Sequence, residues 1–430
     1  MKHPVRKAHR LFILTLLIGV VGLMGAGLAL AARFDPRHDV AVSASALDAA
    51  PATPWPPQAA TPGQVPPAAM DAAPAATPVP LPAGVRVETF IPNVEVPITL
   101  IWGPDGRLYY GDRRRLTVFI YNPDGSLHAR VPVPGVTRQD GLMLGMALHP
   151  RYPQEPWIYI QYTQNTPLSN RYLRFRYEDG VASEPYLLLE APAPPEGCID
   201  HNGGKLVFGP DGMLYIALGE NCIGAMAQDL TVPQGKVLRI DPMTGAGLPD
   251  NPFYDGEGPN DDRIWALGLR NPFGLVFDPF TGELWLSDNG PGCGDEVNRI
   301  VRGGNYGWPF SSPSYFECLD PGAAYIPPLW TWAPPIAPTG ITFYHGNTLP
   351  GWHGDLFMCA WRTGYLYRLQ LDETRTRITA ETVYDIAPAG CTLDVVTGPD
   401  GSLYTNTRDG AIYRLSSLPV WLPLWRQAIP

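Results

Sequence analysis

A turn followed by a short apolar strand recurs six times between residues 103 and 410, and this repeat limits the folds open to the chain. The copies are GPDGRLYYGD (103), HPRYPQEPWIYIQYT (149), GPDGMLYIALGE (209), DPFTGELWLSD (278), LPGWHGDLFMCAW (349) and GPDGSLYTNTRDG (398). Their spacing of about 50 to 70 residues suits β-propeller blades, each of which needs four strands and their loops. A β-sandwich with Asp-Gly hairpins is the alternative, but it does not need one unit six times. We predict an all-β fold, a six-bladed β-propeller.

This fold would bring distant residues together. Blades packed around an axis leave a central channel, and the loops that enter the inner strands converge at one end of it. Candidate functional residues should therefore lie just before or after the repeated strands.

The two ends of the chain differ from the repeats. A basic stretch, MKHPVRKAHR, precedes about twenty uncharged residues, which is typical of an export signal and is also long enough to span a bilayer. We predict a signal peptide or membrane anchor at 1–32, a disordered Ala/Pro-rich linker at 33–84, the propeller at 85–418 and a C-terminal tail at 419–430. The protein would be extracytoplasmic, either secreted or tethered through residues 11–32 to the outer face of the cytoplasmic membrane.

The net charge limits the kinds of partner that the chain can bind, and the cysteines bear on disulfides and metal binding. A formal net charge of -10 argues against nucleic acid and favours a small or neutral ligand. Six cysteines stand at 198, 222, 293, 318, 359 and 391, and in an exported protein an even number indicates disulfides. Six cysteines allow 15 pairings, of which we expect the neighbouring one: 198 with 222, 293 with 318, and 359 with 391. Metal binding is the alternative, but no CxxC or Cys/His cluster has zinc spacing.

The run DHNGG contains the first candidate for chemistry. Asp200 could orient the imidazole of His201, and the glycines let the backbone approach a ligand closely. The same run is also a good turn sequence with no catalytic role.

Three later segments carry further candidates. Arg270 and Asn271 interrupt an apolar stretch, where they either bind a ligand or brace two blades. The turn at Gly290 and Pro291 offers carbonyl oxygens, and Glu296 and Tyr306 offer further hard ligands of the kind calcium accepts. The alternative is that Asp295 and Glu296 are solvated loop charges. The last candidate is Arg362, in CAWRTGYLYRL. It is either a ligand-binding cation at the end of a strand or a surface residue.

Together these segments resemble the glucose/sorbosone dehydrogenase family, the soluble aldose sugar dehydrogenases that depend on pyrroloquinoline quinone (PQQ) and fold as six-bladed propellers. The resemblance covers roughly residues 86 to 415. Its matching segments are GLMLGMALHP, DHNGGKLVFGPDG, QGKVLRIDP, GLRNPFGLVFDP, NGPGCGDEVNRI, GGNYGWP and PTGITFYHGNTLPGWHGDLFMCAWRTGYLYRL.

The resemblance implies roles for these residues in oxidising a sugar's anomeric hydroxyl to a lactone, with an unidentified electron acceptor downstream. His201 would be the general base, Asp200 its orienting carboxylate, and Arg270 the cation near the reacting quinone carbonyl. The other implied PQQ-binding residues are Asn271, Gln139 and Arg362, the last in the place of a family lysine. The implied calcium ligands are the carbonyls of Gly290 and Pro291 and, at a further site, Glu296 and Tyr306.

One segment departs from the family. An Arg-x-Arg-Asp run, whose arginines bind PQQ carboxylates, is replaced here by CTLD, so Cys391 and Leu393 occupy the arginine positions and Asp394 remains. Arg362 or Arg408 could compensate. The alternative function is a non-catalytic, calcium-stabilised propeller that binds a glycan or protein partner at the cell surface; a calcium-dependent lactonase is a third.

Overall fold

The computed structural model describes residues 76–193, 197–198, 200–291, 294–309, 325–408 and 410–417. The predicted export signal, the linker before residue 76, the Cys293–Cys318 pair and the C-terminal tail lie outside these residues. The described residues contain strands and one short 3-10 helix, η2 (Gly224–Gln228), and none of their helices is long and apolar enough to cross a membrane.

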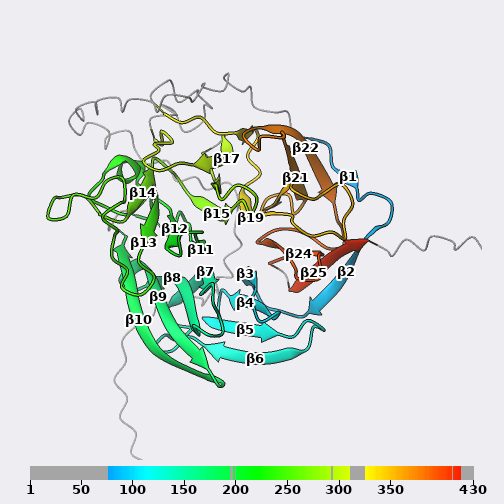
Figure 1. Cartoon of the computed structure of the whole chain (residues 1–430), viewed down its shortest axis with the longest axis horizontal. Coiled ribbons are helices and arrows are strands. Elements are labelled where there is room, and N and C mark those ends of the chain that lie inside the picture. The colour runs from blue at the N-terminus through cyan, green and yellow to red at the C-terminus, as the bar shows by residue number, and fades with distance from the viewer. Residues whose placement is uncertain are drawn as a thin grey trace, which may run out of the picture. The chain divides into compact units, whose positions relative to one another are not determined.

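Six antiparallel sheets surround a common axis, which confirms the predicted six-bladed β-propeller (Figure 1). Blade 1 consists of β3 (Pro97–Trp102), β4 (Leu108–Asp112), β5 (Thr117–Tyr121) and β6 (Leu127–Pro132). Blade 2 consists of β7 (Gly141–Leu148), β8 (Trp157–Asn165), β9 (Leu168–Glu178) and β10 (Val181–Pro192). Blade 3 consists of β11 (Leu206–Phe208), β12 (Leu214–Leu218), β13 (Lys236–Ile240) and β14 (Ile264–Leu267).

Blades 4 to 6 complete the ring. Blade 4 consists of β15 (Pro272–Phe277), β16 (Leu284–Asp288), β17 (Asp295–Ile300) and β18 (Trp330–Trp332). Blade 5 consists of β19 (Pro338–Phe343), β20 (Leu356–Ala360), β21 (Leu366–Leu371) and β22 (Ile378–Asp385). Blade 6 consists of β23 (Val395–Thr397), β24 (Leu403–Asn406), β25 (Ala411–Ser417) and β2 (Val85–Pro92).

The ring is closed by a strand from the other end of the chain. β2 pairs antiparallel with β25 and becomes the outermost strand of blade 6. The first strands of successive blades contact one another in the order β3, β7, β11, β15, β19, β23 and back to β3. Within the Ala/Pro-rich segment, β1 (Val79–Pro80) adds a parallel fifth strand to blade 5.

Each of the six sequence repeats supplies the second strand of one blade, and the GPDG copies show why the turn recurs. In blade 1, Asp105 accepts a hydrogen bond from the hydroxyl of Tyr109 at 2.8 Å. The same Asp–Tyr contact joins Asp211 to Tyr215 and Asp400 to Tyr404, at 3.1 Å in both cases. The turn aspartate therefore satisfies a tyrosine that is otherwise buried between blades.

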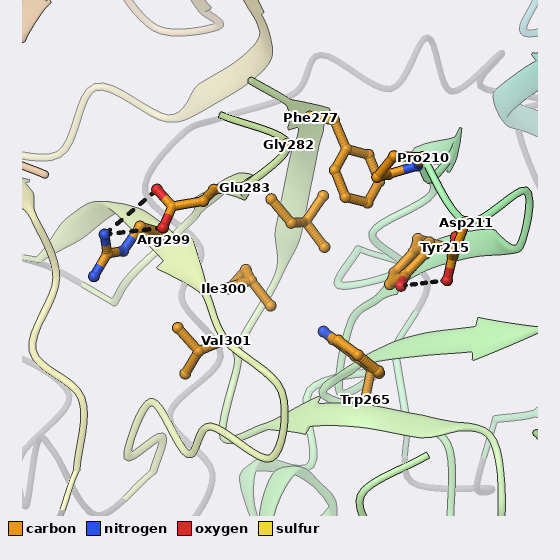
Figure 2. Close-up of a pocket in the computed structure, with 11 residues that line it drawn as sticks. Pro210, Asp211, Tyr215, Trp265, Phe277, Gly282, Glu283, Arg299, Ile300 and Val301 are labelled. Atoms are coloured by element: carbon orange, nitrogen blue, oxygen red, sulfur yellow. Dashed lines mark hydrogen bonds and ion pairs between the residues drawn. The ribbon is translucent and has the colours of Figure 1, made fainter. Parts of the chain in front are cut away.

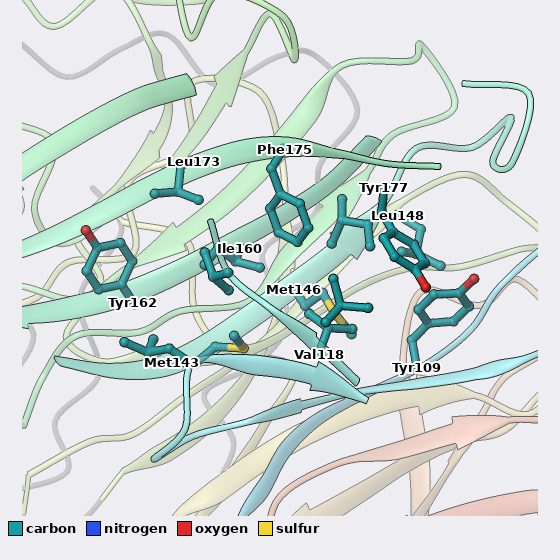
Figure 3. Packing of buried hydrophobic residues seen from close by; sticks show 14 of the residues in the cluster. Tyr109, Val118, Met143, Met146, Leu148, Ile160, Tyr162, Leu173, Phe175 and Tyr177 are labelled. Atoms are coloured by element: carbon teal, nitrogen blue, oxygen red, sulfur yellow. The ribbon is translucent and has the colours of Figure 1, made fainter. Parts of the chain in front are cut away.

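The core lies between blades rather than within one sheet, because each sheet presents apolar side chains on both faces. Figure 3 shows one such cluster, in which Tyr109 and Val118 of blade 1 pack with Met143, Ile160 and Phe175 of blade 2. This packing fixes the loops at the ends of the inner strands.

Candidate functional site

His201 lies in the loop between β10 and β11, at the entrance to the first strand of blade 3. Its Nδ1 is 2.8 and 2.9 Å from the two carboxylate oxygens of Glu220, which follows β12. Glu220 is almost completely buried, with 2% of its side chain exposed, whereas His201 retains 16%. Because Nδ1 is used by Glu220, Nε2 is the nitrogen that can accept a proton from a ligand.

Asp200 does not hold the imidazole, so the predicted orienting residue was wrong. Its side chain is exposed, and its backbone N–H donates to the sulfur of Cys198 at 3.3 Å. Asp200 and His201 are adjacent in the loop, but the hydrogen bonds of the His201 Nδ1 go to Glu220. The carboxylate that reaches Nδ1 comes from 19 residues further along the chain.

A disulfide and a backbone hydrogen bond join the two segments that carry this pair. Cys198 and Cys222 are bonded, as predicted, and the N–H of Asn221 donates to the carbonyl of His201 at 3.0 Å. Cys198, Cys222 and His201 also form the one group of three His, Cys, Asp or Glu side chains close enough to share a metal ion within the described ranges. With both sulfurs in the disulfide, the group is a brace and not a metal site.

The glycines after His201 allow close packing of backbones, and the predicted approach to a ligand stays a prediction. A Cβ on Gly145 of blade 2 would lie 1.6 Å from the carbonyl oxygen of Gly204, so the two backbones touch. Gly203 has φ +62 and a Cβ there would lie 2.6 Å from the carbonyl oxygen of Ala217. Both glycines are buried, and they draw the His201 loop against blade 2 and β12.

Arg270 and Asn271 enter blade 4 directly beside the His201 loop. The carbonyl of Arg270 accepts the N–H of Glu220 at 3.0 Å, and Oδ1 of Asn271 accepts the N–H of Gly203 at 3.1 Å. The structure therefore brings these two predicted residues together with His201. Oδ1 of Asn271 accepts this hydrogen bond within the protein, and its Nδ2 hydrogens are the donors that it can offer to a ligand.

The backbone at Arg270 is fixed by Asp288, a buried carboxylate at the end of β16. It accepts the N–H groups of Arg270 and Asn271 at 2.9 and 2.7 Å. Burial raises the pKa of Asp288 to about 7, against the lowering effect of these two hydrogen bonds and of the Arg270 charge. Nη1 of Arg270 donates to the carbonyls of Asn289 and Gly290 at 2.9 Å, while its Nε is buried without a hydrogen-bond partner in the described residues.

The predicted calcium turn is held by a second buried carboxylate, Asp295. Its Oδ1 accepts the N–H of Gly290, and its Oδ2 accepts those of Ile336 and Ala337. Burial raises the pKa of Asp295 to about 6. The Gly290 carbonyl, one of the predicted calcium ligands, accepts Arg270 and keeps a second lone pair, and Pro291 is partly exposed beside it.

Glu296 and Tyr306 have separate hydrogen-bond partners. Glu296 is paired across the ladder with Asp288, accepts Nδ2 of Asn298 at 2.9 Å, and has a pKa raised by burial to about 8. The Tyr306 hydroxyl donates to the carbonyl of Arg299 and accepts the N–H of Val301. Their shared calcium site stays a prediction.

Cys391 and Leu393 occupy the two positions where the family has arginines, and both have partners inside the protein. Cys391 is bonded to Cys359, as predicted, and is fully buried. Leu393 is also buried and packs in the cluster of blades 1 and 2. The remaining acid, Asp394, accepts Nζ of Lys205 at 2.5 Å and the N–H of Leu100 at 2.8 Å, so it links blades 1, 3 and 6 across the channel.

The other residues considered for cofactor binding are Arg362, Arg408 and Gln139, and all three are exposed. Arg362 is exposed after β20, and its charge lowers the pKa of Asp295. The Arg408 guanidinium lies 5.0 Å from the ring centre of Trp361, and the backbone N–H of Arg408 donates to Oγ1 of Thr392. Gln139 is exposed before β7, and only its backbone carbonyl has a hydrogen-bond partner in the part of the chain described.

A separate hollow of about 300 Å³ lies between blades 3 and 4 (Figure 2). It is lined by Asp211, Tyr215 and Trp265 from blade 3 and by Phe277, Glu283 and Arg299 from blade 4. Asp211 belongs to the turn at the far end of β11 from His201. This hollow is therefore not the site that the His201 loop forms.

The donors around His201 fit a planar, anionic quinone on the blade 4 side. Arg270 supplies a fixed cation with an unpartnered buried Nε, Asn271 supplies an amide N–H, and Arg362 supplies a second cation near the same turn. Sequence reasoning missed three residues of this site: Glu220, Asp288 and Lys205. For the two acids, the available signal was a carboxylate at or just after the end of a mostly apolar strand, as in LYIALGE and LWLSD.

Comparisons with known proteins show which family the chain resembles. The family model for "Glucose / Sorbosone dehydrogenase" matches residues 94–414. Aldose sugar dehydrogenase YliI of Escherichia coli is 29% identical over 353 residues, covering 78% of this chain and 94% of that protein. Quinoprotein glucose dehydrogenase B of Acinetobacter calcoaceticus is 27% identical over 410 residues, covering 74% and 84%. The solved PQQ-bound aldose sugar dehydrogenase of Streptomyces coelicolor gives a TM-score of 0.64 at 27% identity, covering 78% and 99%.

Proposed function

The chain belongs to the glucose/sorbosone dehydrogenase family, and from this membership and the geometry around His201 we propose that it is a PQQ- and calcium-dependent sugar dehydrogenase. Its substrates would be aldoses, oxidised at the anomeric hydroxyl to lactones. The observation that carries the proposal is the His201–Glu220 pair, hydrogen-bonded at 2.8 Å directly beside Arg270 and Asn271.

His201 acts as the general base through Nε2. Glu220 keeps the proton of the neutral imidazole on Nδ1 and stabilises the imidazolium that forms when Nε2 takes the hydroxyl proton of the sugar. General base catalysis of this kind contributes typically ~10²- to 10⁴-fold to the rate. When bound, the quinone supplies the hydride acceptor.

Arg270 contributes a preorganised positive charge. Its backbone is fixed by Asp288 and its Nη1 by two carbonyls, so the guanidinium needs no reorganisation when negative charge develops nearby. Asn271 and Arg362 would hold the cofactor beside it, and calcium would bind the carbonyls of Gly290 and Pro291. The Cys198–Cys222 and Cys359–Cys391 disulfides support the further proposal of an exported protein.

The test is a titration of the purified protein with PQQ, with and without calcium, followed by absorbance and thermal shift. Saturable binding that tightens with calcium, and aldose-dependent reduction of an artificial electron acceptor by the loaded protein, are the expected results. A protein that binds no PQQ under either condition would exclude this function.

One observation favours a second candidate, a calcium-stabilised propeller that binds a glycan or a protein. Cys391 and Leu393 are buried, so neither position provides a group that could bind a cofactor carboxylate. A calcium-dependent rise in melting temperature without any PQQ affinity would support this candidate over the dehydrogenase.

A further inference from the structure

Arg113 occupies a position in blade 1 that corresponds to site positions in three other blades. It directly follows β4, the second strand of its blade. The residues that follow the second strands of blades 3, 4 and 5 include Glu220, Gly290 and Arg362, which all belong to the site described above. Because second-to-third-strand turns share one end of a propeller, Arg113 lies at the same end as these residues.

The backbone of Arg113 is fixed at the inner edge of two blades. Its N–H donates to the carbonyl of Val96, just before β3, at 3.0 Å, and its carbonyl accepts the N–H of Met143, in β7, at 2.9 Å. These are the innermost strands of blades 1 and 2. The side chain therefore starts from the channel side of the molecule.

The side chain of Arg113 is partly buried, and nothing among the described residues compensates its charge directly. Its Nε has no hydrogen-bond partner, and no carboxylate within the described residues forms an ion pair with it. Burial lowers the pKa of Arg113, and the charge of Asp200, the neighbour of His201, counteracts this effect. The two following arginines differ: Arg115 pairs with Glu95, and Arg114 is exposed.

A guanidinium that is partly removed from water and has a buried, unpartnered Nε favours a ligand that supplies an anion and a hydrogen-bond acceptor. Carboxylates are the best match, because the planar guanidinium can bind one through two parallel hydrogen bonds. The proposed cofactor carries three carboxylates, while the two positions where the family has arginines hold buried Cys391 and Leu393.

We propose that Arg113 binds a carboxylate of the quinone cofactor and replaces part of the missing arginine pair. This inference rests on the proposed function and assigns the cofactor a contact in blade 1. The contact lies across the channel from Arg270 in blade 4.

The test compares PQQ titrations of the wild type, Arg113→Gln and Arg114→Gln, with binding followed by absorbance in the absence of sugar. Loss of a charge-assisted hydrogen bond of roughly 1.5 to 3 kcal/mol corresponds to a rise in Kd of about 10- to 150-fold for Arg113→Gln. Arg114→Gln removes the same charge from an exposed neighbour and should bind PQQ like the wild type. Arg113→Lys, which keeps the charge without the planar fork, should lie between them and also serves if the glutamine variant does not fold.

The outcomes separate this inference from the proposed function. If the wild type binds no PQQ, the function and the inference both fail. If the wild type binds PQQ and the Arg113 variants bind it equally well, the inference alone is wrong. An unchanged Kd for PQQ with a raised KM for the aldose would overturn it in favour of a sugar contact.

Discussion

At the scale of single residues, three buried carboxylates hold the other residues of the candidate site in place. Glu220 fixes the imidazole of His201, Asp288 fixes the backbone of Arg270, and Asp295 fixes the turn at Gly290. Each of these acids is buried and accepts hydrogen bonds from the segment that it holds. The residues that we propose to contact a ligand are thus held in place by these buried carboxylates.

Glu220→Gln and Asp200→Asn provide a matched pair of variants for the role of the carboxylate. Glu220→Gln keeps the size of the side chain but removes the charge that stabilises the imidazolium, so kcat should fall at least ~10-fold with PQQ affinity unchanged. Asp200→Asn should lower kcat by much less. Steady-state kinetics at saturating PQQ measure both, and the reverse order of effects would restore Asp200 as the orienting residue.

The sequence supported His201, Arg270 and Asn271 as neighbours, because the family resemblance placed them in one site. It did not identify Glu220, since the pairing of His201 with a residue 19 positions away depends on how β11 and β12 are joined. Adjacency favoured Asp200 instead. A contact of this kind becomes visible only when the hairpin is folded.

At the scale of elements, two short segments must keep their relative position to hold the proposed base, His201, against Glu220. Residues 200–204 carry His201, and the turn at residues 219–222 carries Glu220. The Cys198–Cys222 disulfide and the Asn221 N–H join them. The disulfide is therefore expected to affect catalysis as well as stability.

The double variant Cys198→Ser/Cys222→Ser tests this expectation. Loss of a native disulfide typically costs 2 to 4 kcal/mol, so the melting temperature should fall. Below the transition, kcat should also fall while PQQ still binds, because the base is less well positioned. A lower melting temperature with wild-type kcat would show that the disulfide serves stability alone.

Lys236, the first residue of β13, should make the stability of the protein depend on pH. Its Nζ is buried and donates to the carbonyls of Met226 and Gln234 at 2.7 Å, and burial lowers its pKa to about 7. The unfolded chain then binds more protons than the folded chain between about pH 7 and 10.5, so this group makes stability rise with pH in that window.

The difference in unfolding free energy between the wild type and Lys236→Met isolates this contribution. Relative to the variant, the wild type should gain up to roughly 1.4 kcal/mol per pH unit above pH 7. Chemical denaturation at pH 6, 7, 8 and 9 measures it. A difference that is constant across these values would mean that the pKa of Lys236 is not lowered.

At the scale of the whole molecule, the ring depends on one strand from the N-terminal side. β2 is the outermost strand of blade 6, and Ile91 is buried with Leu100 of blade 1 and Tyr404 and Ile412 of blade 6. The sequence predicted six blades because six turns and strands recur in it. It could not predict the closing pair, since β2 and β25 are about 325 residues apart and no local pattern links them.

Two truncated chains test the closure. A chain that starts at residue 76 keeps β1 and β2 and should unfold cooperatively like the full chain. A chain that starts at residue 93 leaves β25 as an unpaired edge and exposes the apolar surface that Ile91 covers, so it should melt far lower or aggregate. Equal melting temperatures would mean that β2 is not needed to close the ring.

The most direct test of the central claim is a single-turnover measurement of aldose oxidation by the PQQ- and calcium-loaded protein, with wild type and His201→Gln compared. The account predicts a sugar-dependent change in the cofactor absorbance for the wild type, and a rate ~10²- to 10⁴-fold lower for His201→Gln at an unchanged Kd for PQQ. Equal rates for the two proteins would contradict the assignment of His201 as the base. No sugar-dependent change in a wild type that binds PQQ would contradict the proposed function itself.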